Sequence, residues 1–307
     1  MIEETFHAKS ESRQSGYTFI NPLLDCEVDW KWESQKYIPF EKEVTEKIQQ
    51  TIIDKNPWIH LSVYFRNLNN GPWFWVNENE PFSPASLLKL PILISYYKWK
   101  ESKPNLFEEK IPVTTETFWI AQNIAPKNPL KPGEVRTVGE LLEHMIWYSD
   151  NLASTSLVTF IPEEIVNNSF KDFWVTSPTV GTTTTTDFVS VKEYASFFRI
   201  LYNSSYLNRE SSELALKLLS QVDYEDGLKK YIPKNVVVSH KFWERGGELN
   251  GKIVNQLHDC GIVYYSQYPY LICVMTKWET TFPKLQTLIQ NTSKIIFDEI
   301  AEKFPEK

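Results

Sequence analysis

The hydrophobic and polar positions of the chain follow two different periods. Several segments carry apolar residues at helical spacing, or an apolar run too long for a strand, and are predicted to be helices. These segments are residues 41–53, 86–100, 137–148, 152–161, 191–202, 211–222 and 283–304. Shorter runs alternate or are rich in β-branched and aromatic residues, which predicts strands. They are residues 58–66, 73–76, 236–242, 261–265 and 270–276.

The order of the predicted elements indicates the fold class. A helix and two strands are followed by a block of helices, three strands and a last helix. This order predicts an α+β fold, in which helices flank one five-stranded antiparallel sheet as an α/β/α sandwich and the middle block forms a helical lobe. We assign residues 39–82 and 232–305 to the sheet lobe, residues 83–231 to the helical lobe, and residues 1–38 to an N-terminal arm. The threonine run of residues 182–186 is predicted to be a loop or a helix entry. A cleft between the two lobes is the expected ligand site.

Composition excludes two classes of partner. The 307 residues carry a formal net charge of −7 and scattered lysines and arginines, so no face for nucleic acid is expected. The longest apolar stretches, such as residues 90–94, fall far short of the roughly 20 residues that cross a bilayer, so no transmembrane segment is expected. The acidic start, residues 1–4, lacks the basic and apolar regions of a secretion signal. We therefore expect either a cytoplasmic protein or one from which a leader peptide has been removed.

The three cysteines, Cys26, Cys260 and Cys273, are too few and too scattered for a disulfide scaffold or a zinc site. Buried free thiols are therefore expected. If residues 263–265 and 270–272 pair across a turn, Cys260 and Cys273 would face each other on neighbouring strands. A bridge between them is the alternative.

The candidate chemistry begins where a proline-rich loop turns into the apolar helix of residues 86–100. Ser86 and Lys89 lie three residues apart and so share one helix face. Unpaired N–H groups at a helix start favour the anion that forms when a serine attacks a carbonyl. The same field, together with burial among apolar neighbours, favours a neutral lysine. Ser86 is therefore the candidate nucleophile and Lys89 its base, and a helix cap beside a solvated lysine is the alternative.

A second polar group, Ser149-Asp150-Asn151, falls at the break between two predicted helices. A hydroxyl at such a place can relay a proton to a leaving nitrogen, and an amide can hold both the lysine and a substrate carbonyl. Simple helix capping is the alternative, because all three residues are favoured N-caps.

The third group centres on Lys241, near the end of a predicted strand and directly before Phe242, Trp243 and Glu244. A lysine fixed beside the cleft could bind a substrate carboxylate. An exposed edge-strand lysine that prevents aggregation is the alternative.

In this order, the three groups resemble the Ser-x-x-Lys, Ser-Asp-Asn and Lys-Thr-Gly motifs of the class A β-lactamases and penicillin-binding proteins. Residues 82–91 and 258–264 also look like the family's nucleophile segment and the strand after its third motif. The resemblance spans residues 40–305 and implies the family's fold. It also implies a monomeric enzyme without a cofactor, which acts on β-lactams or peptidoglycan stem peptides outside the cytoplasm.

The resemblance implies a role for each matching residue. Ser86 would be acylated, Lys89 would be its base, and Ser149 would shuttle a proton. Asn151 would bind the lysine and the substrate.

The third motif departs from the family's pattern. Lys241 would place positive charge near a substrate carboxylate, and the backbone N–H groups of Ser86 and Glu244 would form the oxyanion hole. After the lysine, however, the family has a hydroxyl and a glycine where this chain has Phe242 and Trp243. A hydroxyl donor is lost, and the Trp243 indole is expected to crowd the substrate site unless strand alternation turns one ring away.

A second departure concerns the glutamate that activates the deacylating water in class A β-lactamases. Between Asn151 and the threonine run the only glutamates are Glu163 and Glu164, predicted to be a solvated pair, and Asp172 is the nearest acidic alternative. Without such a base an acyl-enzyme would form and persist.

Two hypotheses of function follow. The first is an active serine hydrolase with weak β-lactamase or D,D-peptidase activity, and the second is an inactive binding protein on the same fold, with Trp243 reshaping its groove. A metal enzyme is disfavoured because the histidines lack metal-ligand spacing, although His240, His258 and Cys260 could approach one another on adjacent strands. The absence of a Gly-x-Ser-x-Gly motif disfavours an α/β-hydrolase.

Overall fold

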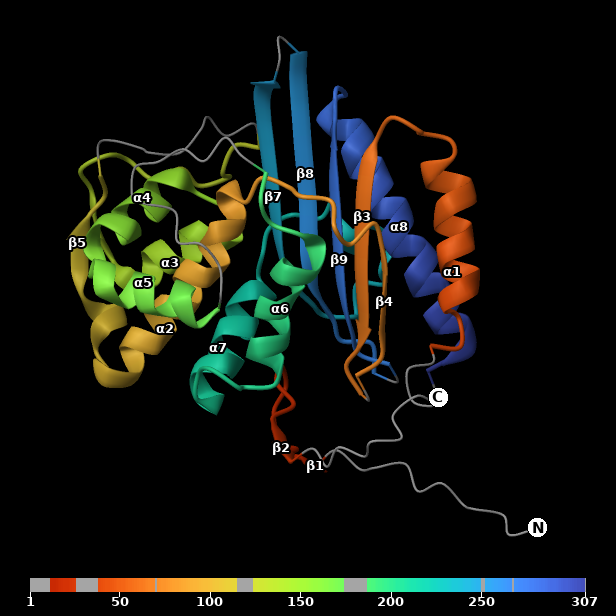
Figure 1. Ribbon diagram of the computed structural model, residues 1–307. Helices are drawn as coiled ribbons and strands as arrows, with labels where there is room; N and C mark the ends of the chain where they lie inside the picture. The colour runs from red at the N-terminus through yellow and green to blue at the C-terminus, as the bar shows by residue number, and fades with distance from the viewer. Residues whose placement is uncertain are drawn as a thin grey trace.

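A five-stranded antiparallel sheet forms the centre of the molecule (Figure 1). The computed structural model describes residues 12–25, 38–69, 71–114, 124–173, 187–249, 252–266 and 268–306. Across the sheet the strands are β4 (Trp73–Val76), β3 (His60–Asn67), β9 (Tyr270–Trp278), β8 (Lys252–Val263) and β7 (Val238–Leu249). The edge strands are therefore β4 and β7.

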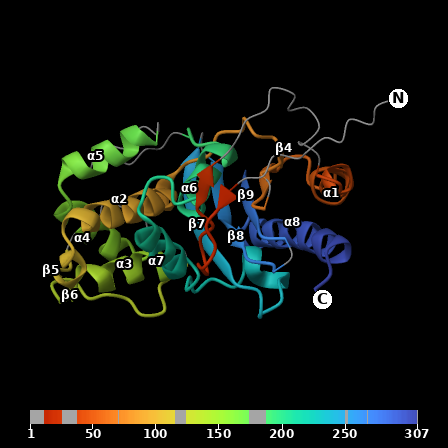
Figure 2. The ribbon, with the colours of Figure 1, turned by 90° about the horizontal axis from the view of Figure 1, so that it is seen from below.

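Helices cover both faces of this sheet, which gives three layers (Figures 1 and 2). One outer layer contains α1 (Glu41–Ile48), which continues as a π-helical turn over Gln49–Ile53, and α8 (Phe282–Lys303). The other contains α2 (Lys89–Ser102), α3 (Val138–Trp147), α4 (Asn151–Phe160), α5 (Glu163–Asp172), α6 (Val191–Tyr202) and α7 (Arg209–Leu219). The predicted α+β class and its five-stranded antiparallel sheet are confirmed. Within the described ranges, no helix has the length and apolarity needed to cross a membrane.

Shorter elements connect these layers. The 3₁₀ turns are η3 (Ala85–Leu88), η4 (Leu106–Glu108) and η5 (Leu228–Tyr231). Two small pairs of strands are β1 (Ser12–Arg13) with β2 (Leu23–Asp25), and β5 (Lys110–Pro112) with β6 (Val135–Thr137).

The alternation of side chains along β9 explains why the sheet has a core on each face. Leu271, Cys273 and Met275 belong to the cluster shared with α2, α3, α6 and α7. Ile272 and Val274 point to the opposite side and belong to the cluster shared with α1 and α8. Because both faces are covered, the strand is an almost continuous apolar run, and each fully buried side chain contributes roughly 1.5–3 kcal/mol.

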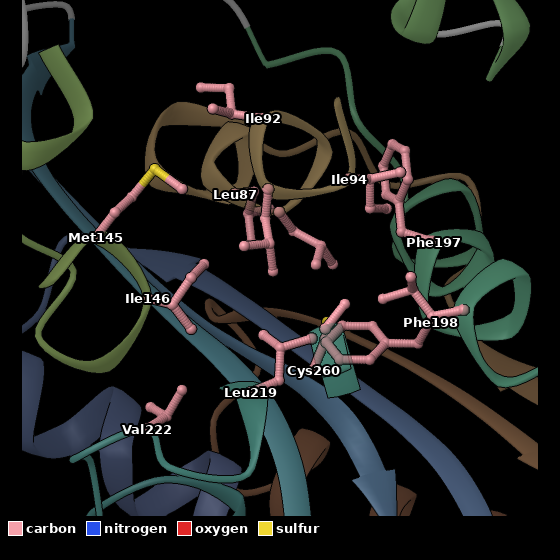
Figure 3. Packing of buried hydrophobic residues seen from close by; sticks show 14 of the residues in the cluster. Leu87, Ile92, Ile94, Met145, Ile146, Phe197, Phe198, Leu219, Val222 and Cys260 are labelled. Atoms are coloured by element: carbon pink, nitrogen blue, oxygen red, sulfur yellow. The ribbon is translucent and has the colours of Figure 1, made fainter. Parts of the chain in front are cut away.

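Helix α2 lies in the middle of the larger core. Figure 3 shows Leu87 and Ile94 from η3 and α2 facing side chains of α3, α6, α7 and the sheet. Met145 and Phe198 are among these neighbours. The buried helix predicted over residues 86–100 is therefore confirmed.

Most predicted boundaries agree with the structure to within a few residues, and the main differences are two longer strands, one helix, and the short strands β1, β2, β5 and β6, which were not predicted. The predictions for residues 73–76 and 191–202 match β4 and α6. Strands β7 and β8 extend well beyond the predicted ranges, because their outer halves contain polar and glycine residues that lack a strand signal. Helix α5 was not predicted.

The expectation of buried free thiols is wrong for two of the three cysteines. Cys260 on β8 and Cys273 on β9 are paired in register and form a disulfide, with Cα atoms 4.0 Å apart. The two cysteines thus face each other as that alternative predicted, although β9 pairs with residues 255–263 and not with 264–265, and the bridge is the alternative observed. Cys26 and the threonine run of residues 182–186 lie outside the described residues.

The described part of the N-terminal arm, residues 12–25, is attached to the helical layer. The carboxylate of Glu213 on α7 accepts the backbone N–H groups of Thr18, Phe19 and Ile20 at 2.8, 2.9 and 3.0 Å. The hydroxyl of Tyr264, which follows β8, donates to the carbonyl of Phe19 at 2.9 Å.

Candidate active site

Ser86 lies in the 3₁₀ turn η3, which runs directly into α2 at Lys89. Side chains three residues apart eclipse each other in a 3₁₀ turn, so Ser86 and Lys89 share one face even more closely than in an α-helix. Ser86 is half-buried, whereas Lys89 has no exposed surface. Pro91 occupies the first turn of α2, where its missing N–H costs no helical hydrogen bond.

The Lys89 ammonium position is surrounded by acceptors from the Ser149-Asp150-Asn151 segment. The Nζ atom is hydrogen-bonded to the carbonyl oxygen of Ser149, to the Ser149 Oγ at 3.1 Å and to the Asn151 Oδ1 at 2.8 Å. The first two predicted groups therefore meet, as the sequence indicated.

Burial lowers the pKa of Lys89 well below its usual value, and the positive charge of Lys241 lowers it further, while Asp150 and Glu244 act in the opposite direction. A neutral amine has two N–H donors and one lone pair. It can donate to the Ser149 carbonyl and to Asn151 while accepting a proton from a hydroxyl. This shift favours the neutral amine, which is the form that a general base requires.

The backbone of Ser149 is in the left-handed region, with φ of 55°. A non-glycine residue in this conformation is costly and is common at functional sites. The turn directs both the carbonyl and the hydroxyl of Ser149 at Lys89. Asp150 follows as the buried N-cap of α4, and its carboxylate accepts the N–H of Ala153 at 2.9 Å.

The edge strand β7 packs directly against η3 and brings Lys241 to the site. Lys241 is fully buried, donates to the carbonyl of Phe242 at 2.9 Å, and lies 4.5 Å from the centre of the Phe242 ring. Burial lowers the pKa of Lys241 to about 7, although Asp259 opposes the shift. The alternative of an exposed edge-strand lysine is therefore wrong.

Phe242 and Trp243 point to opposite faces of β7, and both are part of the larger core. The Phe242 ring stacks on Tyr224 with ring centres 4.1 Å apart. The Trp243 indole has no exposed surface and lies 4.3 Å from the ring of His258. Burial keeps the pKa of His258 well below its usual value. The indole is therefore part of the larger core, and its ring has no exposed surface that a substrate could contact.

His240 on β7 and Asp259 on β8 form a buried pair, with Nδ1 and Oδ1 2.9 Å apart. Asp259 also accepts the N–H of Leu228 at 2.9 Å. Gly261 lies against this pair, since a Cβ there would be 2.5 Å from the Cβ of His240. His240 is engaged by a carboxylate and Cys260 by a disulfide, so the predicted approach of His240, His258 and Cys260 does not produce a set of free ligands.

Sequence reasoning assigned only the backbone of Glu244 and missed its side chain. The Glu244 carboxylate accepts the N–H of Ile124, so it reaches from β7 across to the helical side of the site. Its charge is felt by Lys89. Nothing in the local sequence marks a glutamate on a strand as a residue of the site.

A chain of hydrogen bonds fixes the loop that enters η3. The Ser83 N–H donates to the Gln256 Oε1 at 3.1 Å, and the Gln256 Nε2 donates to Asp187 at 2.9 Å. Lys277 pairs with the same carboxylate at 3.1 Å, and Arg245 donates to the Ser83 hydroxyl. These partners are far apart in sequence, and no motif indicates them.

The acidic residues considered for deacylation have other surroundings. Glu163 and Glu164 are exposed in the first turn of α5, as predicted. The Asp172 carboxylate accepts the hydroxyl of Tyr206 at 3.0 Å.

Comparison with protein families gives one match, to the beta-lactamase enzyme family over residues 43–300. No curated relative matches the chain.

Solved structures with the same fold include penicillin-binding and β-lactamase proteins. PBP-A is 21% identical, with a TM-score of 0.69, and the match covers 85% of this chain and 97% of that one. A β-lactamase from Sphaerobacter thermophilus is 17% identical, with a TM-score of 0.68 and coverage of 88% and 100%. A β-lactamase from Chitinophaga pinensis is also 17% identical, with a TM-score of 0.71 and coverage of 84% and 99%. Another similar structure is a PBP-A mutant as its acyl-enzyme complex with penicillin G, at 21% identity and a TM-score of 0.70, covering 85% and 97%. At these identities the likeness shows the fold.

Proposed function

Because the chain belongs to the beta-lactamase enzyme family, we propose that it is a serine acyl-transfer enzyme that forms an acyl-enzyme on Ser86 with β-lactams or D-alanyl peptides. The observation that carries the proposal is the buried Lys89 amine, held between Ser149 and Asn151 one 3₁₀ turn from Ser86.

The proposed acylation uses these groups in sequence. The Ser86 Oγ attacks the carbonyl carbon as its proton passes to the Lys89 amine, and the N–H groups of Ser86 and Glu244 stabilise the oxyanion. The C–N bond then breaks, and the proton reaches the leaving nitrogen through the Ser149 hydroxyl. The ester on Ser86 persists, because Glu163 and Glu164 are exposed and Asp172 bonds to Tyr206.

A second candidate is an inactive binding protein on the same fold. It is favoured by the aromatic side chains of Phe242 and Trp243, where the family's third motif has a hydroxyl and a glycine.

The test is the intact mass of the protein after incubation with benzylpenicillin, with Ser86→Ala in parallel. We expect a stable adduct of one penicillin that is absent from the variant. An unmodified protein that also consumes no penicillin would reject acyl transfer to this β-lactam and favour the binding protein. In that case Trp243→Gly would be the next variant to measure.

A further inference from the structure

The side chain of Glu244 is the starting point. It belongs to the residue whose backbone N–H is proposed for the oxyanion hole, and its carboxylate accepts the N–H of Ile124 on the opposite side of the site. A negative charge is therefore fixed beside the position of the reacting carbonyl. That charge acts on Lys89, which places it within electrostatic reach of the base.

The side chains that could bind a substrate anion are already engaged by other groups of the protein. Lys241 donates to the Phe242 carbonyl and lies over the Phe242 ring, so its charge is engaged inside the protein. Phe242 offers a ring stacked on Tyr224 in place of a hydroxyl donor. Arg245 is the only arginine of β7, and it donates to Ser83 in the loop before the nucleophile.

Among the described residues around Ser86, Arg245 is bonded to Ser83, and two carboxylates stand against two lysines whose positive charge burial weakens. Burial lowers the pKa of Lys241 to about 7, so its positive charge is partial at neutral pH, and burial also lowers the pKa of Lys89, which weakens the charge of that group. Asp150 and Glu244 supply two carboxylates against them. In a site of reduced dielectric constant, a further anion is repelled more strongly than in water.

We propose that Glu244 makes this site selective for acyl donors whose leaving side is uncharged, such as an amide, an ester or an internal peptide bond, over donors that carry a carboxylate there. The inference rests on the proposed acyl transfer to Ser86 and ranks its substrates, with D-alanyl peptides whose leaving part is amidated or continues as a chain ahead of those that end there in a free carboxylate. It predicts that penicillins, which carry a carboxylate, are slow acylating agents.

The test uses two thioesters of N-acetylglycine that differ at one group. One has thioglycolate as leaving group and is anionic, and the other has thioglycolamide and is neutral. The burst of thiol release gives the second-order rate constant of acylation by each ester, which is divided by the rate of hydroxide hydrolysis of the same ester, and intact mass of the quenched reaction checks acylation of Ser86. The variants are Glu244→Gln and, as a matched loss of one charge, Glu46→Gln on the exposed face of α1.

We expect the wild-type protein to favour the neutral ester at least tenfold. Glu244→Gln should reduce this ratio at least fivefold, whereas Glu46→Gln should leave the ratio unchanged. Raising the ionic strength should bring the ratio of the neutral to the anionic rate constant closer to one in the wild-type protein, which tests the charge effect even if a variant misfolds.

Two results would overturn the proposal, and they are distinguishable. If Ser86 is acylated by both esters and the anionic one is preferred, or if the ratio is the same in Glu244→Gln as in the control, the role of Glu244 is rejected and acyl transfer stands. If neither ester nor penicillin modifies Ser86, acyl transfer itself is rejected, and the selectivity falls with it.

Discussion

Lys241 is an ionisable side chain buried in the protein, where a positive charge is unfavourable. It has no exposed surface, and Asp259 only partly offsets the burial that brings its pKa to about 7. In the unfolded chain a lysine keeps its proton up to a pH of about 10.4. Between these pH values the unfolded chain therefore binds more protons than the folded one.

It follows that the free energy of unfolding should rise with pH from about 7 to 10. The contribution of Lys241 is at most about 1.4 kcal/mol per pH unit. We expect Lys241→Met to reduce this slope, measured by urea unfolding at several pH values in that window. The exposed Lys42→Met provides the control. Equal slopes in the wild-type protein and Lys241→Met would show that the folded lysine keeps an ordinary pKa.

For single residues, the sequence predicts which side chains can take part in the chemistry better than it predicts where those side chains point. An apolar run around Lys89 is enough to predict its burial, and the order of the three groups is enough to bring Ser149 and Asn151 to it. The same reasoning could not tell that the Trp243 ring packs on His258, or that Glu244 reaches Ile124. Those directions depend on which face of β7 meets the helical layer, which is a tertiary property.

At the scale of elements, the position of η3 depends on the sheet. Gln256 on β8 accepts from Ser83 and donates to Asp187, so one buried amide connects a strand to the loop before the nucleophile. This arrangement makes Gln256 a positioning residue for Ser86.

We expect Gln256→Ala to slow acylation of Ser86 about tenfold at saturating acyl donor, with little change in the donor concentration at half-saturation. Leaving the Ser83 N–H unpaired should also cost about 1–3 kcal/mol of unfolding free energy. Asn255→Ala is the matched control, because its side chain donates to the Thr280 carbonyl instead. Gln256→Glu retains an acceptor for Ser83 and should recover part of the rate. Normal acylation in Gln256→Ala would contradict the positioning role.

Strand and helix boundaries show why elements are only partly predictable. Helix α6, which has a strong apolar face and a Ser190 capping box, is predicted to the residue. The outer halves of β7 and β8 are not, because residues on both of their faces are at least partly exposed there, and such strands need no alternation of apolar and polar residues. Helix α5 was missed because Pro162 and two glutamates read as a solvated loop, although both are typical of a helix start.

The whole molecule includes a stretch of the N-terminal arm that the family match does not cover. Three consecutive N–H groups at Thr18, Phe19 and Ile20 converge on the single carboxylate of Glu213. Charge-assisted hydrogen bonds of this kind are stronger than neutral ones. The described hydrogen bonds between the arm and α7 therefore go to this one side chain, while Asn21 donates to the carbonyl of Tyr202 and Ile20 is buried in the larger core.

We expect Glu213→Ala to release residues 12–25 while the main fold stays intact. Limited proteolysis should cleave the variant within this stretch at least fivefold faster than the wild-type protein. The midpoint temperature of thermal unfolding should be lower by a few degrees. Glu210→Ala, an exposed change on the same helix, is the control. Equal cleavage in all three proteins would mean that other contacts hold the arm.

At this largest scale, the order of elements predicts the three-layer arrangement, because a helix-flanked sheet with a helical insertion has few ways to bury both of its faces. The docking of the arm was not predictable, since its partners lie nearly 200 residues away in the chain.

The bridge between Cys260 and Cys273 joins two central strands from inside the protein. Both sulfur-bearing residues have no exposed surface and lie on the sheet face that the helical layer covers, so glutathione or any other thiol can exchange with the pair only when that layer moves away from the sheet. Oxidation must therefore take place as the chain folds, or during a rare opening between the helices and the sheet. After that, the molecule retains the oxidation state of the compartment in which it folded, even when it is moved to a different one.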